Sequence, residues 1–201
     1  MPKVFGEFFD VLPYVRDSLE INFTPTTHPV RQRWSTNRLS AQFIADYFSA
    51  FLPIDDNQPD SDRRFKEARG AVSYVANELL ENAMKFNYAE SKLKVKFAIY
   101  FLEKRSEEDS GITVVLLATN SLSPVAQEKF QAFLVELFAG DPEILYITQV
   151  EKSLSEENAQ SSGLGFLTMI NDYSAKLGWK FETVSVEPEV LTVTTMVQIK
   201  V

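Results

Sequence analysis

The chain has 201 residues, of which none is cysteine and only one is histidine. The absence of cysteine excludes a disulfide framework, a zinc–thiolate centre and a cysteine nucleophile, and one histidine is too few for a multi-histidine metal site. Basic residues are outnumbered by acidic ones, which gives a net charge of −8. Broad, non-specific binding to nucleic acid needs a basic surface, so we expect no nucleic-acid partner.

Long apolar runs are also missing. No stretch approaches the ~20 consecutive apolar residues that a membrane helix requires. The first residues, MPKVFGEFFDVL, carry acidic side chains where a signal peptide has its apolar segment. Hydrophobic residues make up 45% of the chain and charged residues 24%, which is ordinary globular composition. We therefore expect a cytoplasmic protein that has no membrane partner.

Hydrophobic periodicity predicts one domain over residues 19–201, preceded by an arm or short helix over residues 1–18. Alternating apolar residues predict strands at 18–25, 93–102, 110–120, 179–186 and 191–201. A 3.6-residue period predicts helices at 35–51, 64–86, 123–140 and 163–178. Residues 25–33, 104–111 and 151–163 are expected to form loops, the last of them mobile. This order favours an α+β fold: an α/β sandwich with a mixed, mainly antiparallel sheet covered on one face by helices.

Two apolar segments need a place to pack. One face of the helix at 35–51 carries large apolar side chains that we assign to the core: Leu39, Phe43, Tyr47 and Phe51. The arm is apolar for a terminus, with Val4, Phe5, Phe8, Phe9 and Leu12. It has two possible uses that the sequence leaves open: packing on its own domain, or burial against a second copy in a homodimer.

The helix at 64–86 contains the stretch ANELLENAMKFN, in which Glu78, Asn82 and Lys85 are spaced i, i+4 and i+7. These side chains line up beside the apolar stripe, at the edge of the core, where a pocket can open. A carboxylate there can orient or deprotonate a nucleophile, an amide oxygen suits Mg²⁺, and a lysine can contact phosphate. The same spacing also fits an ordinary solvated helix face, because Glu and Lys are common on helix surfaces.

A second stretch, SSGLGF at 161–166, is a glycine-containing turn that leads into a helix. Glycine lets the backbone approach an anion closely, and the N–H groups at a helix N-terminus point towards such an anion. By itself this pattern also fits a plain loop-to-helix junction. Together, the two stretches indicate a site for a phosphorylated ligand.

Together the motifs resemble the GHKL superfamily, whose Bergerat fold is shared by gyrase, sensor histidine kinases and anti-sigma-factor serine kinases. NELLENAMKF resembles its N-box, SGLGFLTMINDYSAKLGWKFE its second glycine box with the following helix and strand, and VTTMVQIKV its last strand. The resemblance implies that Glu78 is the catalytic carboxylate, that Asn82 binds Mg²⁺, and that Lys85 faces the phosphates. It also implies that Gly163 and Gly165 cradle the triphosphate of ATP.

The remaining parts of the family pattern are matched less evenly. Thr195 matches a residue near the adenine, and residues 141–162 match the lid over ATP. The first glycine box, Asp-x-Gly-x-Gly, is absent, and LLATNSLSP stands in its place. The side-chain oxygen of Asn120 can accept a hydrogen bond from adenine there. In lacking this box and in having the helix SPVAQEKFQAFLVEL, the chain resembles the SiaB-type regulatory protein kinases.

The resemblance implies a Mg·ATP-dependent serine/threonine protein kinase that phosphorylates a small regulatory protein in a partner-switching signalling pathway. The missing glycine box supports a second hypothesis, a catalytically inactive GHKL-fold module that regulates a partner by binding alone. Autophosphorylation on histidine is a poor third alternative, because His28 lies in a proline-flanked loop rather than in a helix.

Overall fold

The structure is a computed structural model that describes residues 2–13, 15–24, 30–52, 60–103, 112–155, 163–186 and 189–201. A six-stranded sheet runs through it in the order β1-β5-β6-β4-β3-β2, and each of its five pairings is antiparallel. Its strands are β1 (Lys3–Gly6), β2 (Val15–Phe23), β3 (Val95–Glu103), β4 (Ile112–Leu122), β5 (Lys176–Val186) and β6 (Glu189–Lys200).

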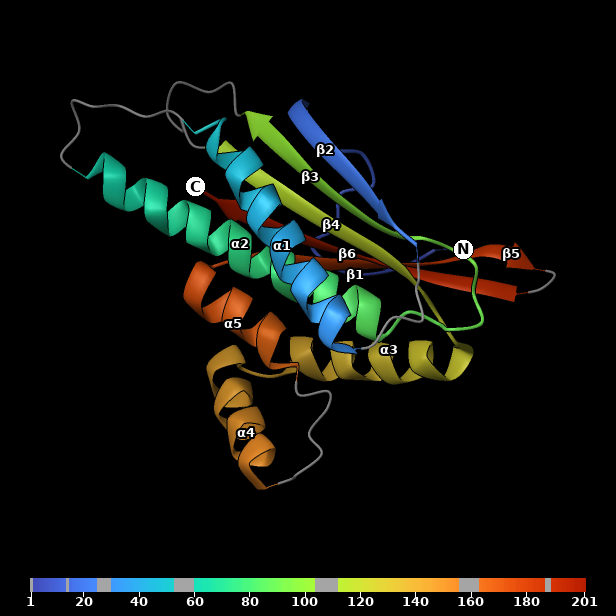
Figure 1. The fold of residues 1–201 in the computed structure, drawn as a ribbon. Helices are drawn as coiled ribbons and strands as arrows, with labels where there is room; N and C mark the ends of the chain where they lie inside the picture. Colours follow the sequence, from blue (N-terminus) through green and yellow to red (C-terminus); the bar gives the residue numbers. More distant parts are fainter. Residues whose placement is uncertain are drawn as a thin grey trace.

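Helices pack on one face of this sheet (Figure 1). They are α1 (Val30–Ser49), α2 (Ser61–Lys85), α3 (Pro124–Ala139), α4 (Pro142–Ser155) and α5 (Leu164–Tyr173). α2 lies directly on the sheet and α1 packs beside it, whereas α4 touches α5 and extends away from the sheet (Figure 1). The predicted α+β sandwich is confirmed. In the described part of the chain, no helix is both long enough and apolar enough to cross a membrane.

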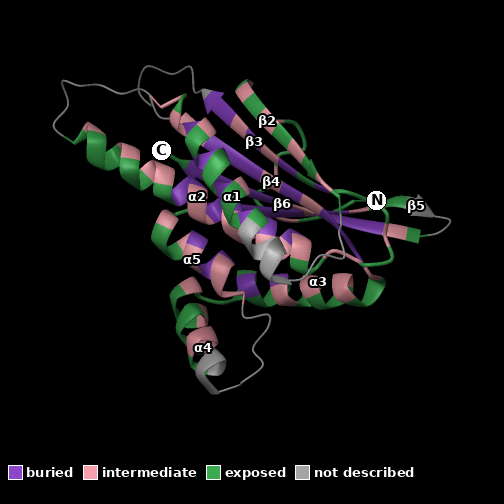
Figure 2. Cartoon of the chain, in the orientation of Figure 1, coloured by how far each residue is buried: buried purple, intermediate pink, exposed green. Residues whose placement is uncertain are grey.

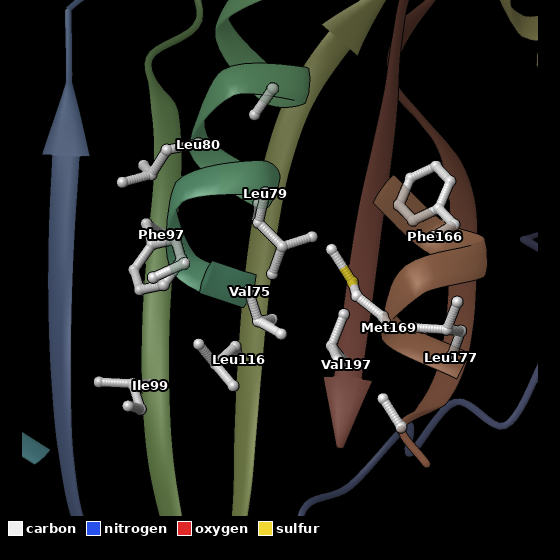
Figure 3. Packing of buried hydrophobic residues seen from close by; sticks show 14 of the residues in the cluster. Val75, Leu79, Leu80, Phe97, Ile99, Leu116, Phe166, Met169, Leu177 and Val197 are labelled. Atoms are coloured by element: carbon white, nitrogen blue, oxygen red, sulfur yellow. The ribbon is translucent and has the colours of Figure 1, made fainter. Parts of the chain in front are cut away.

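The main core lies between α2, α5 and the sheet. Figure 3 shows Val75, Leu79 and Leu80 of α2 close to Phe97 of β3 and its neighbours, and the same cluster continues under α5. Figure 2 shows that the buried residues gather on this inner side of the helices and along the central strands. Each fully buried Leu or Phe contributes roughly 1.5–3 kcal/mol relative to its exposed state. This packing fixes α2 on the sheet and leaves its neighbouring polar side chains at the core's edge.

The N-terminal arm forms a strand rather than a helix, and it packs on its own domain. β1 and β2 occupy opposite edges of the sheet, so residues 7–13 cross the face that the helices leave open. Phe8 and Leu12 cover a small apolar cluster on that face, and Gln198 Nε2 donates a hydrogen bond of 2.8 Å to the Glu7 carbonyl. A Cβ at Gly178 would collide with that carbonyl, so glycine permits the crossing. Homodimerisation through the arm stays a prediction.

α1 begins at Val30, earlier than expected, and the predicted buried face is wrong at Leu39 and Phe43. Leu39 is 66% exposed and Phe43 is 54% exposed, whereas the buried residues are Asn37, Ala41, Ile44, Ala45 and Phe48. Residues spaced strictly by four drift about 40° per step around a helix with 3.6 residues per turn. A buried stripe must therefore alternate steps of three and four, as positions 37, 41, 44 and 48 do. Tyr47 and Phe51 do pack, on the ring of Phe101.

Two other boundaries differ from the sequence prediction. The helix expected over 163–178 ends at Tyr173, because Ser174 adopts a left-handed φ of 49° and Ala175 N–H donates to the Met169 carbonyl. Part of the expected loop is helix α4, which Asp141 caps by accepting hydrogen bonds from two backbone N–H groups. Residues 156–162 of that loop, the 104–111 turn and His28 lie outside the described residues.

Asn87 joins the end of α2 to the end of β4. Its Oδ1 accepts hydrogen bonds from Ser121 N–H at 3.1 Å and from Ser121 Oγ at 2.9 Å. The Ser121 carbonyl in turn accepts from Tyr88 N–H at 3.0 Å and from Asn120 Nδ2 at 3.0 Å. Ser121 is 1% exposed, so water cannot replace these partners. The network holds the polar end of α2 over the end of β4.

We predict that Asn87→Ala lowers the free energy of unfolding by about 2–3 kcal/mol, because it leaves the buried N–H and hydroxyl of Ser121 without an acceptor. Urea unfolding followed by circular dichroism measures the loss. Asn171→Ala, at an exposed position of α5, is the matched control: it removes only an exposed hydrogen bond of 3.4 Å to the Pro142 carbonyl and should change stability by less than about 1 kcal/mol. An Asn87→Ala protein as stable as this control would contradict the role assigned to the network.

Candidate functional site

One cavity of about 540 Å³ opens between the C-terminal half of α2, α3, the start of α5, and strands β4 and β6. Its size is within the range of small-molecule binding sites. All seven residues singled out in the sequence line it: Glu78, Asn82, Lys85, Asn120, Gly163, Gly165 and Thr195. Residues from four separate elements therefore meet around one space.

α2 supplies the charged wall of the cavity. Glu78, Glu81 and Asn82 are half-buried there, and Lys85 is exposed at the end of the helix with its Nζ 5.2 Å from the centre of the Phe86 ring. Burial raises the pKa of the Glu78 carboxyl above its usual value, and the nearby carboxylate of Glu81 raises it further. The positive charge of Lys85 acts in the opposite direction. Glu78 therefore holds a proton more readily than an exposed glutamate.

The first turn of α5 forms the adjoining wall and has glycine at two positions of close approach to its neighbours. Gly163 caps the helix with a left-handed φ of 63°, and a Cβ there would lie 2.5 Å from the Phe133 ring. A Cβ on Gly165 would overlap the carboxylate of Glu78. α5 therefore begins in direct contact with both α3 and α2. The start of a helix attracts anions, through its backbone N–H groups and its dipole.

The sheet forms a neutral floor. Asn120 on β4 is 6% exposed and Thr195 on β6 is 7% exposed, and both project from the helix-covered face. In the register of these strands Ala118 is opposite Thr195, and Asn120 is opposite Val193. Asn120 and Thr195 are therefore diagonal neighbours, with the small side chain of Ala118 beside them. The bond from Asn120 Nδ2 to the Ser121 carbonyl orients the amide.

α3 supplies a wall that the sequence analysis did not identify. Ala126, Lys129, Phe130 and Phe133 line the cavity, and Phe130 stacks against Phe133 and Phe166 with ring centres 6.3 and 6.2 Å apart. These four α3 positions are spaced i, i+3, i+4 and i+7, which is the spacing of one helix face. The pattern was therefore present in the sequence, but it does not distinguish a cavity wall from an ordinary core face.

The cavity combines a charged rim with a neutral, aromatic interior. Two carboxylates and two lysines lie on the helices, and the polar groups on the sheet are uncharged. Carboxylate and amide oxygens from Glu78 and Asn82 are the kind of ligand that Mg²⁺ takes in proteins. The arrangement fits a ligand with an anionic end, neutralised by lysine and a hard cation, and a flat apolar end.

Comparisons with known proteins give one structural match. No protein-family model and no curated protein matches this chain. Among solved structures, it is similar to a chain in the crystal structure of the SiaB–SiaC complex from Pseudomonas aeruginosa, with a TM-score of 0.51 and 17% sequence identity. The match covers 91% of this chain and 89% of that chain. The two chains therefore share a fold over nearly their whole length, and at this identity the match does not assign residue roles.

The raised pKa predicts that Glu78→Gln stabilises the protein at neutral pH but not in acid. The folded protein keeps the Glu78 proton to higher pH than the unfolded chain does, so ionisation of this carboxyl costs stability as pH rises. Wild type and variant should be about equally stable near pH 4, below the ordinary glutamate pKa. The advantage of the variant should grow as pH rises through the folded-state pKa of Glu78.

Urea unfolding at pH 4 and pH 8 measures this difference. Glu67→Gln is the control, because Glu67 is exposed on the same helix and does not line the cavity. An advantage for Glu78→Gln that is the same at both pH values would show that the carboxyl is not destabilised by ionisation in the fold.

Proposed function

We propose that this chain binds Mg·ATP through a GHKL-like domain over residues 19–201 and acts as a serine/threonine protein kinase on a small regulatory protein. The observation that carries the proposal is the single cavity that brings together five residues of two separate sequence motifs, along with Asn120 and Thr195. If the α2 motif were only a solvated helix face and the α5 turn only a loop junction, nothing would bring their residues together around one cavity.

In this proposal each wall of the cavity has a separate task. Asn82 holds Mg²⁺, and the first turn of α5, with Gly163 and Gly165, receives the phosphates. Lys85 and Lys129 supply positive charge at the rim. The bound Mg²⁺ supplies neutralisation of the charge that develops on the transferred phosphoryl group. Catalysis of phosphoryl transfer is largely positioning and electrostatic stabilisation. A Mg²⁺ ligand, backbone N–H groups and lysine side chains are the kinds of group that provide both.

Glu78 is the proposed catalytic carboxylate. It lies on the cavity wall between the α5 turn and the charged rim, where a substrate hydroxyl could approach the phosphates. Its raised pKa brings the carboxyl closer to the range in which a general base works at neutral pH. As a base, Glu78 would accept the proton of a serine or threonine hydroxyl as that oxygen bonds to the γ-phosphorus. The bond between the γ-phosphorus and the β–γ bridging oxygen would break in the same step, with ADP as the leaving group.

The partner class follows from two sources. The resemblance to SiaB-type kinases implies phosphorylation of a small regulatory protein, and the similar solved structure is that of a complex between two proteins. A role in partner-switching signal transduction is the corresponding proposal for this chain.

One observation favours a non-catalytic alternative. β4 continues to Leu122, and α3 begins at Pro124 with Ser123 as its cap, so a single residue connects them. No glycine-rich turn stands between the described residues of β4 and α3. A module that regulates its partner by docking alone would not need one, and the nucleotide-binding measurement below separates the two hypotheses.

We predict that Mg·ATP raises the thermal midpoint of the wild-type protein. At 1 mM nucleotide, a Kd of about 10 µM stabilises the folded state by about 2.7 kcal/mol, which corresponds to about 5–10 °C for a chain of this size. Asn82→Ala should lose most of the shift, whereas Asn77→Ala, on the same helix but outside the cavity, should retain it. Absence of any shift at millimolar Mg·ATP in the wild type would favour the non-catalytic module.

We also predict that Glu78→Ala lowers phosphoryl transfer by at least about 100-fold, because a positioned base contributes 10²–10⁴-fold to such steps. The assay uses purified protein, γ-labelled Mg·ATP and an extract of the source cells. Labelled phosphoserine or phosphothreonine is then mapped by mass spectrometry. Binding of Mg·ATP by the variant should remain largely intact, and Glu67→Ala should transfer normally. Transfer at the wild-type rate by Glu78→Ala would remove Glu78 from this role.

A further inference from the structure

The interior of the cavity contains two buried polar groups with unused hydrogen-bonding capacity. Among the described residues, Asn120 makes one side-chain hydrogen bond, from Nδ2 to the Ser121 carbonyl, and its Oδ1 has no partner. The hydroxyl of Thr195 likewise has no side-chain partner within the described chain. Neither oxygen is sealed off from the cavity, because Trp179 Nε1 is the one fully buried side-chain N or O atom without a partner among the described residues. Both groups are therefore available to pair with a ligand that enters the cavity.

The place of these groups indicates which part of a nucleotide they meet. The charged lining residues all come from α2 and α3, and the sheet residues of the floor are all uncharged. Asn120 and Thr195 lie diagonally across β4 and β6, which puts their Cα atoms roughly 7–8 Å apart. Ala118 and Val193 complete this floor, and the rings of Phe130 and Phe166 are close by. A flat heterocycle fits here better than a triphosphate, which carries charge.

The hydrogen-bonding character of the two groups then determines which base is accepted. A carboxamide both donates and accepts, and so does a hydroxyl, whose hydrogen rotates to suit its partner. Adenine presents an amino donor at C6 and an acceptor at N1, whereas guanine presents an acceptor at C6 and a donor at N1. Neither Asn120 nor Thr195 is restricted to one of these roles. Neither carries a negative charge that would repel the guanine oxygen.

We infer that the cavity binds purine nucleotides with little discrimination between adenine and guanine, so that the chain takes Mg·GTP as well as Mg·ATP. This inference rests on the proposed nucleotide site and adds its base specificity. Asn120 is the specificity-determining residue, because replacing its amide with a carboxylate leaves an acceptor only. A carboxylate pairs with the amino group of adenine and repels the oxygen of guanine.

Isothermal titration calorimetry with Mg·ADP, Mg·GDP and Mg·UDP tests the inference without turnover. For the wild type we expect the Kd values of the two purine nucleotides to agree within about threefold, and the smaller pyrimidine to bind more weakly. Asn120→Asp should favour Mg·ADP over Mg·GDP by at least about tenfold, since mismatched buried polar groups are strongly disfavoured. Asn77→Asp makes the same chemical change on α2 outside the cavity and should leave the ratio unchanged.

The outcomes separate this inference from the proposed function. A wild type that binds Mg·ADP at least tenfold more tightly than Mg·GDP overturns the base tolerance and leaves the nucleotide site standing. A wild type that binds no nucleotide overturns both. An Asn120→Asp protein that folds and keeps the wild-type ratio removes Asn120 as the residue that reads the base. If that variant does not fold, because its carboxylate faces the Ser121 carbonyl, the wild-type ratio alone decides.

Discussion

The close approach of α5 to α2 and α3 is the constraint on which the cavity depends. Gly163 turns the chain into α5 against the ring of Phe133, and Gly165 lies against the carboxylate of Glu78. A side chain at Gly163 would adopt a strained backbone conformation and meet the Phe133 ring of α3, and one at Gly165 would displace the Glu78 carboxylate of α2 from its place. The buried residues of α5 belong to the same core cluster as those of α2 and the sheet. The same two glycines thus close the core on one side and bring backbone N–H groups to the cavity on the other.

The distribution of charge around the cavity follows from the packing of its walls. α2 buries Leu79 and Ala83 on the sheet, so residues one position away lie at the core's edge, where water can still reach a carboxylate or an ammonium. Residues of β4 and β6 have neighbouring strands on both sides and helices above them. An ion there would lose nearly all its hydration, at a cost of several kcal/mol. Neutral Asn120 and Thr195 can remain polar at that depth, whereas a carboxylate would need a compensating partner.

The sequence predicted the fold class and the meeting of the site residues from two local patterns, the i, i+4, i+7 spacing on α2 and the glycine turn before α5. It failed where the deciding contacts are not local. The buried face of α1 depends on how that helix crosses its neighbours. The stripe predicted at Leu39 and Phe43 is therefore rotated around the helix from the face that is buried. The arm showed apolar residues, but only the sheet order shows that residues 7–13 must cross its open face. Lys129 and Phe133 lie on a helix face whose spacing looks like any core face.

One hydrogen-bond network at the end of β4 links the fold to the cavity floor. The match to a chain of the SiaB–SiaC complex covers 91% of this chain, yet 17% identity leaves most side chains free to differ. A hydrogen-bond network built on Ser121, from Asn87, Tyr88 and Asn120, holds that strand end in a fixed position. Because the network orients the Asn120 amide, it joins the stability of the fold to the chemistry of the cavity floor. A change that loosens Ser121 would therefore affect both the stability of the fold and the position of the Asn120 amide.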